Sequence, residues 1–263
     1  MKHFFRSVLC IGTAWTVCLL GGITVFSLSP ADDLYLTKTP DAGIAYLDQL
    51  TFLGESTTAH LINRAVLSGG KATTQVLANE SGTMLLSAKT PSQEILHPKT
   101  GERIALSDYV AKEKPPYLVL SFGLNGIVGF SKNPELYLHD YQALIDSIQA
   151  ASPCTAILLQ TVYPVRSPKK ANDWHFLQSV DEINERINTL NQALPTLAAA
   201  NTAVKIVDTA SVLRDESGAL RAEYATEDGI HLRREAYLAI LAYLRTHAYH
   251  LPIPLPITPE HWR

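Results

Sequence analysis

Short apolar runs alternate along the chain with longer segments in which apolar residues recur at helical spacing. The runs over 117–122 and 155–161 are almost continuously apolar, as in strands that are buried on both faces of a sheet. Strands that alternate with helices form parallel sheets with right-handed crossovers. We therefore expect one α/β domain over residues 45–250. Its predicted strands lie at 52–53, 74–78, 117–122, 155–161 and 204–208, and its predicted helices at 45–50, 59–67, 107–113, 134–150, 180–200 and 233–247.

Three further segments fall outside this alternation. The stretch from Ile95 to Leu106 holds the turn sequence 98–101 between two extended runs, which predicts an inserted β-hairpin. Residues 29–44 are rich in Ser, Pro, Asp, Thr and Gly, and we interpret them as a linker. The tail over 251–263 contains repeated prolines and is predicted to be irregular.

The N-terminus has the features of a membrane anchor. Lys2 and Arg6 precede the stretch 7–28, which contains no charged residue and would be about 33 Å long as a helix, enough to cross a bilayer. Basic residues before the span predict that the N-terminus stays in the cytoplasm and the domain lies outside it. A cleaved signal peptide is the alternative, although Leu28 and Pro30 are poor residues at a cleavage site. We expect a single-pass protein of the cell membrane.

Composition excludes several classes of function. The chain has 263 residues, of which 46% are hydrophobic, so it is long enough for one sizeable core. A formal net charge of -3 without a basic cluster argues against nucleic-acid binding. Two of the three cysteines, Cys10 and Cys18, lie in the N-terminal apolar stretch and leave Cys154 alone in the domain, which excludes a disulfide framework. No residues show metal-ligand spacing, and histidines such as His60 and His97 are interpreted mostly as surface residues.

Ser56 is the first candidate for chemistry. It follows the apolar run that ends at Gly54 and precedes the helix expected from Ala59. A serine on the turn between a strand and a helix is displayed at the carboxyl edge of the sheet, where such folds bind ligands. Taken alone, Ser56 is better explained as a helix cap.

Two distant stretches favour the catalytic interpretation. Asp228 and His231 are three residues apart before the last helix, so the carboxylate could orient one ring nitrogen while the other meets Ser56. Asn125 follows a buried strand through Gly123 and could donate to an oxyanion. Each has a plain structural alternative: an Asp-Gly turn with a solvated histidine, and an asparagine that stabilises its own loop.

Together these stretches resemble the blocks of the GDSL-like, or SGNH, hydrolase family. The matching blocks are Gly54-Glu55-Ser56, Gly82, Gly123-Leu124-Asn125 and Asp228-Gly229-Ile230-His231, in the family's order and spacing across about residues 45–250. The resemblance implies a Ser56, His231 and Asp228 triad without a cofactor or metal. It implies an oxyanion hole made by Ser56, Gly82 and Asn125, and contacts to substrate from Glu55, Gly123 and Tyr163.

The expected fold is a flavodoxin-like three-layer sandwich with the strand order 2-1-3-4-5 and the candidate residues at its switch point. Glu55 stands where the family usually has aspartate, so the loop geometry could differ. Gly69 and Gly70 are nearby rivals of Gly82, which we prefer because it follows the second strand. The chain lacks the G-x-S-x-G elbow of α/β-hydrolases, since Thr58 sits two residues after Ser56.

The resemblance implies a serine esterase outside the cytoplasm. Exported members of the family often act on acyl groups of cell-wall or secreted polysaccharides, so the expected substrate is a short O-acyl, such as acetyl, ester of a carbohydrate. A lipid ester is the second expectation. The alternative from another class is a tethered, non-catalytic module that binds glycan or a partner, which the unusual Glu55 keeps open.

Overall fold

The structure is a computed structural model that describes residues 34–250. Its centre is a five-stranded sheet in the order β2-β1-β5-β6-β7, and every neighbouring pair is parallel. The strands are β1 Leu50–Gly54, β2 Val76–Leu77, β5 Tyr117–Ser121, β6 Ala156–Gln160 and β7 Val204–Val207. The order by label differs from the predicted 2-1-3-4-5 because β3 and β4 form a separate hairpin. Counted among the sheet strands alone, the sheet runs second, first, third, fourth, fifth.

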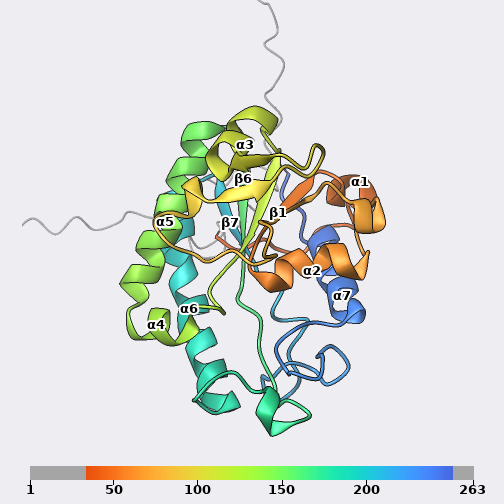
Figure 1. The fold of residues 1–263 in the computed structure, drawn as a ribbon, viewed down its shortest axis with the longest axis vertical. Helices are drawn as coiled ribbons and strands as arrows, with labels where there is room; N and C mark the ends of the chain where they lie inside the picture. The colour runs from red at the N-terminus through yellow and green to blue at the C-terminus, as the bar shows by residue number, and fades with distance from the viewer. Residues whose placement is uncertain (1–33, 251–263) are drawn as a thin grey trace, which may run out of the picture.

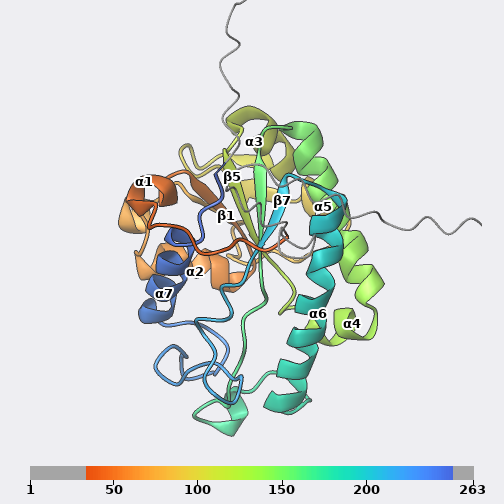
Figure 2. The same ribbon diagram turned by 180° about the vertical axis from the view of Figure 1, so that it is seen from behind.

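Helices cover both faces of this sheet (Figures 1 and 2). One face carries α3, α4, α5 and α6, and the other carries α1, α2 and α7. The helices are α1 Gly43–Leu47, α2 Ser56–Arg64, α3 Leu106–Glu113, α4 Ile127–Lys132, α5 Pro134–Ala151, α6 Val180–Ala200 and α7 Arg234–Arg245, with 3-10 turns η1 Gly70–Ala72, η2 Thr90–Ser92 and η3 Ala171–Asp173.

Alternate side chains of the central strands supply the two cores. In β5, Leu118 and Leu120 pack under α3 to α6, whereas Tyr117 and Val119 pack under α1, α2 and α7. This follows from the twofold alternation of side chains along a strand. It explains why the strand reads as a continuous apolar run, since each face is covered by helices. The three-layer α/β architecture and the five-stranded parallel sheet are therefore confirmed.

The inserted hairpin is also confirmed. β3 Glu94–Leu96 pairs with β4 Arg103–Ala105 in antiparallel register. One helix start differs from expectation: α3 begins at Leu106, with Ala105 as its N-cap, and not at residue 107. Leu106 is fully buried, and packing of this side chain places the helix start one residue earlier.

The segment before α1 differs from the predicted linker where the structure describes it. The Leu36 N–H donates to the Ile206 carbonyl at 2.8 Å, and Tyr35 forms a parallel bridge with Ile206, so this segment extends the sheet beyond β7. Asp41 forms an ion pair with Arg245 at the end of α7. The Ser, Pro and Thr content led us to expect a loose tether, but backbone hydrogen bonds form with any residue except proline at the donor position.

Between residues 34 and 250, no helix is both long and apolar enough to span a bilayer. The expected anchor over 1–28 and the proline-rich tail over 251–263 lie outside the described residues.

Candidate active site

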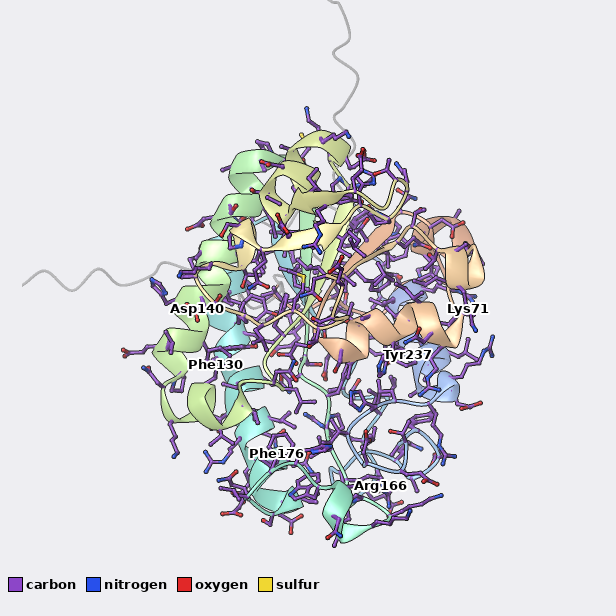
Figure 3. All side chains as sticks on the ribbon, viewed as in Figure 1. Lys71, Phe130, Asp140, Arg166, Phe176 and Tyr237 are labelled. Carbon is purple, nitrogen blue, oxygen red and sulfur yellow. The ribbon has the colours of Figure 1, made fainter. Side chains whose placement is uncertain are left out.

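Ser56 is the first residue of α2, directly after the turn that leaves β1. Gly54 ends the strand with its backbone packed against β5: a Cβ there would lie 2.3 Å from the Ser121 carbonyl oxygen. Glu55 is the N-cap, in an extended conformation, and no side chain caps the helix. The reading of Ser56 as a cap is therefore wrong. The first turn is held in place by Tyr237 of α7, whose hydroxyl donates to the Thr57 carbonyl at 2.6 Å (Figure 3).

Ser56, His231 and Asp228 form a hydrogen-bonded chain. Ser56 Oγ lies 3.1 Å from His231 Nε2, and His231 Nδ1 lies 2.6 Å from Asp228 Oδ2. Ser56 and His231 meet across 175 residues of sequence because β1 and the loop before α7 both end at the same edge of the sheet. The arrangement has the order nucleophile, base, orienting carboxylate that serine hydrolysis requires.

Asp228 is held ionised by its neighbours. Burial alone would raise the pKa of this carboxyl, but hydrogen bonds from the Thr226 hydroxyl, the His231 ring and two backbone amides hold the pKa well below its ordinary value. An ionised carboxylate can only accept hydrogen bonds, so His231 Nδ1 must donate. The other ring nitrogen, Nε2, is then the acceptor that faces the Ser56 hydroxyl. Sequence analysis missed Thr226, whose position two residues before Asp228 is the signal that could have identified it.

Gly229 anchors this loop against the chain after β6. Its φ of +74° favours glycine, and a Cβ there would lie 2.2 Å from the Arg166 carbonyl oxygen. The Arg166 N–H donates to the Gly229 carbonyl at 2.9 Å. The Thr226 N–H donates to the His231 carbonyl at 2.8 Å and closes the loop. The Asp-Gly turn is thus the element that aligns Asp228 with His231.

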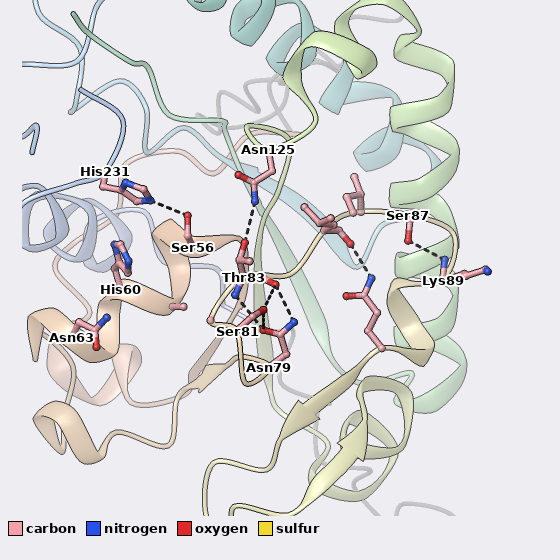
Figure 4. A pocket seen from close by; sticks show the side chains of 15 residues that line it. Ser56, His60, Asn63, Asn79, Ser81, Thr83, Ser87, Lys89, Asn125 and His231 are labelled. Carbon is pink, nitrogen blue, oxygen red and sulfur yellow. Dashed lines mark hydrogen bonds between the residues drawn. The ribbon is translucent and has the colours of Figure 1, made fainter. Parts of the chain in front are cut away.

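Asn125 lies on the other side of Ser56 from His231 (Figure 4). Its side-chain Nδ2 donates to Thr83 Oγ1 at 3.1 Å, which fixes the orientation of the amide. An amide nitrogen carries two hydrogens, so one remains for a second acceptor. The Ser56 N–H, at the first position of α2, has no acceptor within its helix. These two groups can donate to an oxyanion above Ser56.

Gly82 lies at the same site but uses its amide elsewhere. It borders the same groove as Ser56, Asn125 and His231. Its N–H donates to the Asn79 carbonyl at 3.0 Å, closing a turn in which Gly82 has a φ of +69°. In this conformation the Gly82 amide does not serve as the third oxyanion donor that the sequence led us to expect. The rival Gly70 begins η1, which follows α2, and Gly69 is its N-cap; neither borders the groove.

Glu55 is a buried clamp on the loop that carries Asn125. Its carboxylate accepts from the Gly123 N–H at 2.9 Å and the Asn125 N–H at 3.1 Å. Burial raises the pKa of this carboxyl to about 7, and the backbone hydrogen bonds only partly oppose the shift. Glu55 and Gly123 were predicted to contact substrate, and this is wrong: both are buried, and their polar groups bind each other.

Tyr163 is likewise a core residue rather than a substrate contact. It is 6% exposed and belongs to the core beneath α2 and α7. Its hydroxyl donates to Gln160 Oε1 at 3.1 Å. The chain after β6 does reach the active edge, but this side chain turns inward, which the sequence could not reveal.

The comparison with protein families agrees with this geometry. A family model described as the GDSL-like Lipase/Acylhydrolase family matches residues 52–239. This match begins just before Ser56 and ends after His231, so it spans all of the polar groups described above. The chain belongs to this family. As a GDSL-like acylhydrolase, it is an enzyme that hydrolyses ester bonds.

Solved structures resemble the acylhydrolase over most of its length. One, described as a platelet activating factor from Streptococcus pneumonia, is 20% identical, with 77% of this chain and 87% of that chain covered and a TM-score of 0.50. A carbohydrate esterase of family 3 from Talaromyces cellulolyticus is 14% identical over 74% and 93% of the two chains, with a TM-score of 0.46. A catalytic mutant of an acetylxylan esterase from Geobacillus stearothermophilus is 15% identical over 82% and 97%, with a TM-score of 0.42. The first of these supports the fold alone. A search of curated sequences finds no match.

Ser56 and His231 of the acylhydrolase border a groove of about 1060 Å³. One wall is α2, and the other is formed by the turn after β2 and the segment that follows it (Figure 4). Among the lining residues, Lys89 is charged, His60 and His231 carry an imidazole ring, and the others are uncharged. Besides Ser56, seven lining side chains carry a hydroxyl or an amide, and Leu85 and Leu86 add apolar surface; the seven are Asn63, Asn79, Ser81, Thr83, Ser87, Gln93 and Asn125.

His60 is the residue of the groove that sequence analysis placed wrongly. It was grouped with surface histidines, but its ring lies 4.8 Å from the His231 ring, with the planes tilted by 39°. Burial, followed by the nearby charges of His231 and Arg64, lowers the pKa of His60. The spacing from Ser56 to His60 is one helical turn, and this was the available signal.

Proposed function

We propose that this acylhydrolase is a serine esterase in which Ser56 is the nucleophile. The observation that carries the proposal is the continuous hydrogen-bonded chain from Ser56 Oγ through His231 to Asp228. His231 Nε2 takes the hydroxyl proton as Ser56 attacks the ester carbonyl, and Asp228 stabilises the imidazolium that forms. His231 then protonates the leaving alcohol. In the second half His231 takes a proton from water as the water attacks the acyl-enzyme, and it returns that proton to Ser56 Oγ as the acid leaves.

The oxyanion is stabilised by the Ser56 N–H and the Asn125 side chain. The Asn125 side chain is oriented before substrate arrives, since Thr83 accepts from its amide and Glu55 accepts from its backbone N–H. Donors fixed in advance need no reorganisation when charge develops on the carbonyl oxygen. The same fixed geometry disfavours the non-catalytic alternative, because Glu55 supports the site instead of disordering it.

The groove favours a short acyl group on a carbohydrate over a lipid ester. The groove combines apolar surface at Leu85 and Leu86 with seven amide and hydroxyl side chains besides Ser56, and a long acyl chain would leave those polar groups without partners. Such groups match the hydroxyls of a sugar. We therefore favour short O-acyl esters, such as acetyl esters, of a cell-wall or secreted carbohydrate.

We place the enzyme at the cell membrane, with its domain outside the cytoplasm. The support is the uncharged stretch 7–28 with Lys2 and Arg6 before it. Protease added to spheroplasts should digest the domain while it remains with the membranes. Recovery of the intact chain from cytosol would contradict this location.

The nucleophile is tested by a pair of serine substitutions. Ser56→Ala should remove nearly all hydrolysis of aryl acetates, by at least about 10³-fold in kcat, and abolish labelling by a fluorophosphonate probe. Ser179→Ala is the matched control, since Ser179 caps α6 through a capping box with Glu182. It should cost roughly 1 kcal/mol of stability and keep turnover.

Further substitutions separate the roles within the site. His231→Ala should lose about as much activity as Ser56→Ala because members of a triad act as a unit. Asn125→Ala should lower kcat by roughly 10²–10³-fold with little change in KM. If folded wild-type protein neither hydrolyses an aryl acetate nor takes the probe, the esterase proposal is wrong and the binding-module alternative is favoured.

A further inference from the structure

One face of α2 continues the active site beyond the nucleophile. Ser56, Ala59, His60 and Asn63 all border the groove. Their spacing of three, four and seven residues places them on one side of a helix. Beyond the nucleophile, this face of α2 therefore presents two polar side chains, His60 and Asn63, to a ligand in the groove.

The ring nitrogens of His60 have different surroundings. Nδ1 is buried and has no hydrogen-bond partner among the described residues. Nε2 is not buried in this way. A neutral imidazole carries one proton, and a buried N–H without an acceptor is rarer than an unused acceptor. Burial lowers the pKa of His60 and so favours the neutral ring. The proton then belongs on Nε2, the nitrogen that reaches the groove as a donor.

The direction of ester cleavage assigns this face of α2 a role. In the tetrahedral intermediate the oxyanion must point to Asn125 and the leaving oxygen to His231 Nε2. Figure 4 shows Asn125 and Thr83 on one side of Ser56, and His231, His60 and Asn63 on the other. The alcohol half of the ester must consequently leave Ser56 on the side of His60.

We propose that α2 forms the subsite for the alcohol half of the substrate, with His60 Nε2 and Asn63 binding hydroxyl groups next to the ester oxygen. This inference rests on the proposed serine esterase function. It commits the substrate to a polyhydroxylated alcohol, since an alcohol without neighbouring hydroxyls would leave these groups unpaired. The proposal also assigns a different part of the substrate to each side of Ser56: the carbonyl oxygen faces Asn125, and the alcohol faces His60.

The test compares two acetyl esters that differ only in their alcohol. The first is 4-nitrophenyl acetate, whose alcohol has no free hydroxyl group, and the second is a set of methyl xylopyranoside monoacetates. For both, kcat/KM is measured from acetate release. His60→Phe keeps a ring beside His231 but removes the donor, so the ratio of sugar ester to aryl ester should fall by about 3–10-fold, the effect of one neutral hydrogen bond.

Companion variants keep the test decisive. His60→Gln restores an N–H donor and should recover part of the ratio, and His60→Phe combined with Asn63→Ala should lower it further. His139→Phe is the control, since the His139 side chain on α5 is 70% exposed and does not border the groove. Melting curves of each variant identify any that fail to fold, in which case the comparison rests on His60→Gln and Asn63→Ala.

The outcomes separate this inference from the esterase proposal. A His60→Phe variant that loses both activities in equal proportion would show that His60 acts only by supporting His231, and the subsite would be wrong. A wild type that cleaves the aryl acetate but none of the sugar acetates would also overturn it while the esterase proposal stands. Absence of activity on both esters, together with no probe labelling, would instead remove the esterase proposal itself.

Discussion

At the scale of single residues, Glu55 decides how this site differs from the family pattern. The longer side chain places its carboxylate under the Gly123 and Asn125 amides, where it accepts from both. Burial raises its pKa to about 7, against an ordinary value of 4.5. Glu55 thus positions the loop that carries Asn125, and ionisation of its buried carboxyl lowers the free energy of unfolding.

This raised pKa predicts a pH dependence of stability. Between about 4.5 and 7 the unfolded chain has lost the Glu55 proton while the folded protein still holds it. Folding stability therefore falls as pH rises through this window. In Glu55→Gln that component is absent, so the difference in melting temperature between wild type and variant should change steadily from pH 4.5 to 7.

Glu216→Gln, in an exposed loop, serves as the control and should follow the wild-type curve at every pH. Thermal melts of the three proteins in matched buffers provide the measurement. A wild type and Glu55→Gln pair whose melting temperatures differ by a constant amount across the window would show that Glu55 does not titrate there.

The residues of the candidate site that present polar groups to the groove were predictable from the sequence, whereas the orientation of side chains near the core was not. Ser56, Asp228, His231 and Asn125 could be named because residue type and order carry the signal, and the structure brings them together. Whether a side chain turns toward the groove or the core depends on packing between distant segments. Tyr163 was misplaced for this reason.

At the scale of elements, the loop before α7 packs against the segment that follows β6, and this contact positions Asp228 and His231. Gly229 sits so close to the Arg166 carbonyl that no side chain fits between them. Helices and strands with strong periodicity were predictable, and α6 begins and ends at the predicted residues. The six-residue helix α4 was not predicted, since it is too short to show a period between Gly126 and Asn133.

Substitutions at two glycines can distinguish the effect of backbone strain from the effect of close packing. Gly229 and Gly218 both have positive φ, at +74° and +85°, but a Cβ at Gly218 meets nothing within 4 Å. Alanine at either position should cost about 1–2 kcal/mol of backbone strain. Only Gly229→Ala should also displace the Asp228 and His231 loop, and a shift of about 1 Å there can lower kcat by roughly 10²-fold.

Stopped-flow or steady-state assays on an aryl acetate, with melting temperatures, distinguish the two effects. Gly218→Ala should lose stability and keep its kcat. Equal kcat values for the two variants would mean that the contact with Arg166 does not align the triad.

At the scale of the whole molecule, the segment before α1 completes the sheet. β7 is the outermost parallel strand, and residues 34–36 pair along its open edge through Leu36 and Ile206. An uncovered edge strand is a template for association with other chains. The segment was read as a linker because composition reports local preference, whereas pairing with a strand about 170 residues away depends on the assembled sheet.

The edge-covering role predicts different behaviour for two shortened chains. A chain beginning at residue 34 retains the pairing with β7. A chain beginning at residue 43 loses the backbone hydrogen bonds that join Leu34 and Leu36 to Ile206, Thr39 to Thr246 and Ala42 to Arg245. With each bond contributing about 0.5–1.5 kcal/mol, the loss should be roughly 2–6 kcal/mol. The shorter chain should therefore melt at lower temperature in calorimetry and associate more readily in light scattering.

A substitution shows whether the backbone pairing or the ion pair carries this effect. Asp41→Asn, in the chain that begins at residue 34, removes the negative charge that pairs with Arg245 but leaves the sheet edge covered. Both partners are substantially exposed, so this change should lower the melting temperature much less than removal of residues 34–42 does. If Asp41→Asn destabilises the protein as much as removal of residues 34–42, the ion pair dominates and edge covering is not the reason for the loss. If the two chains melt together, the segment is a linker after all, held by contacts too weak to matter to the fold.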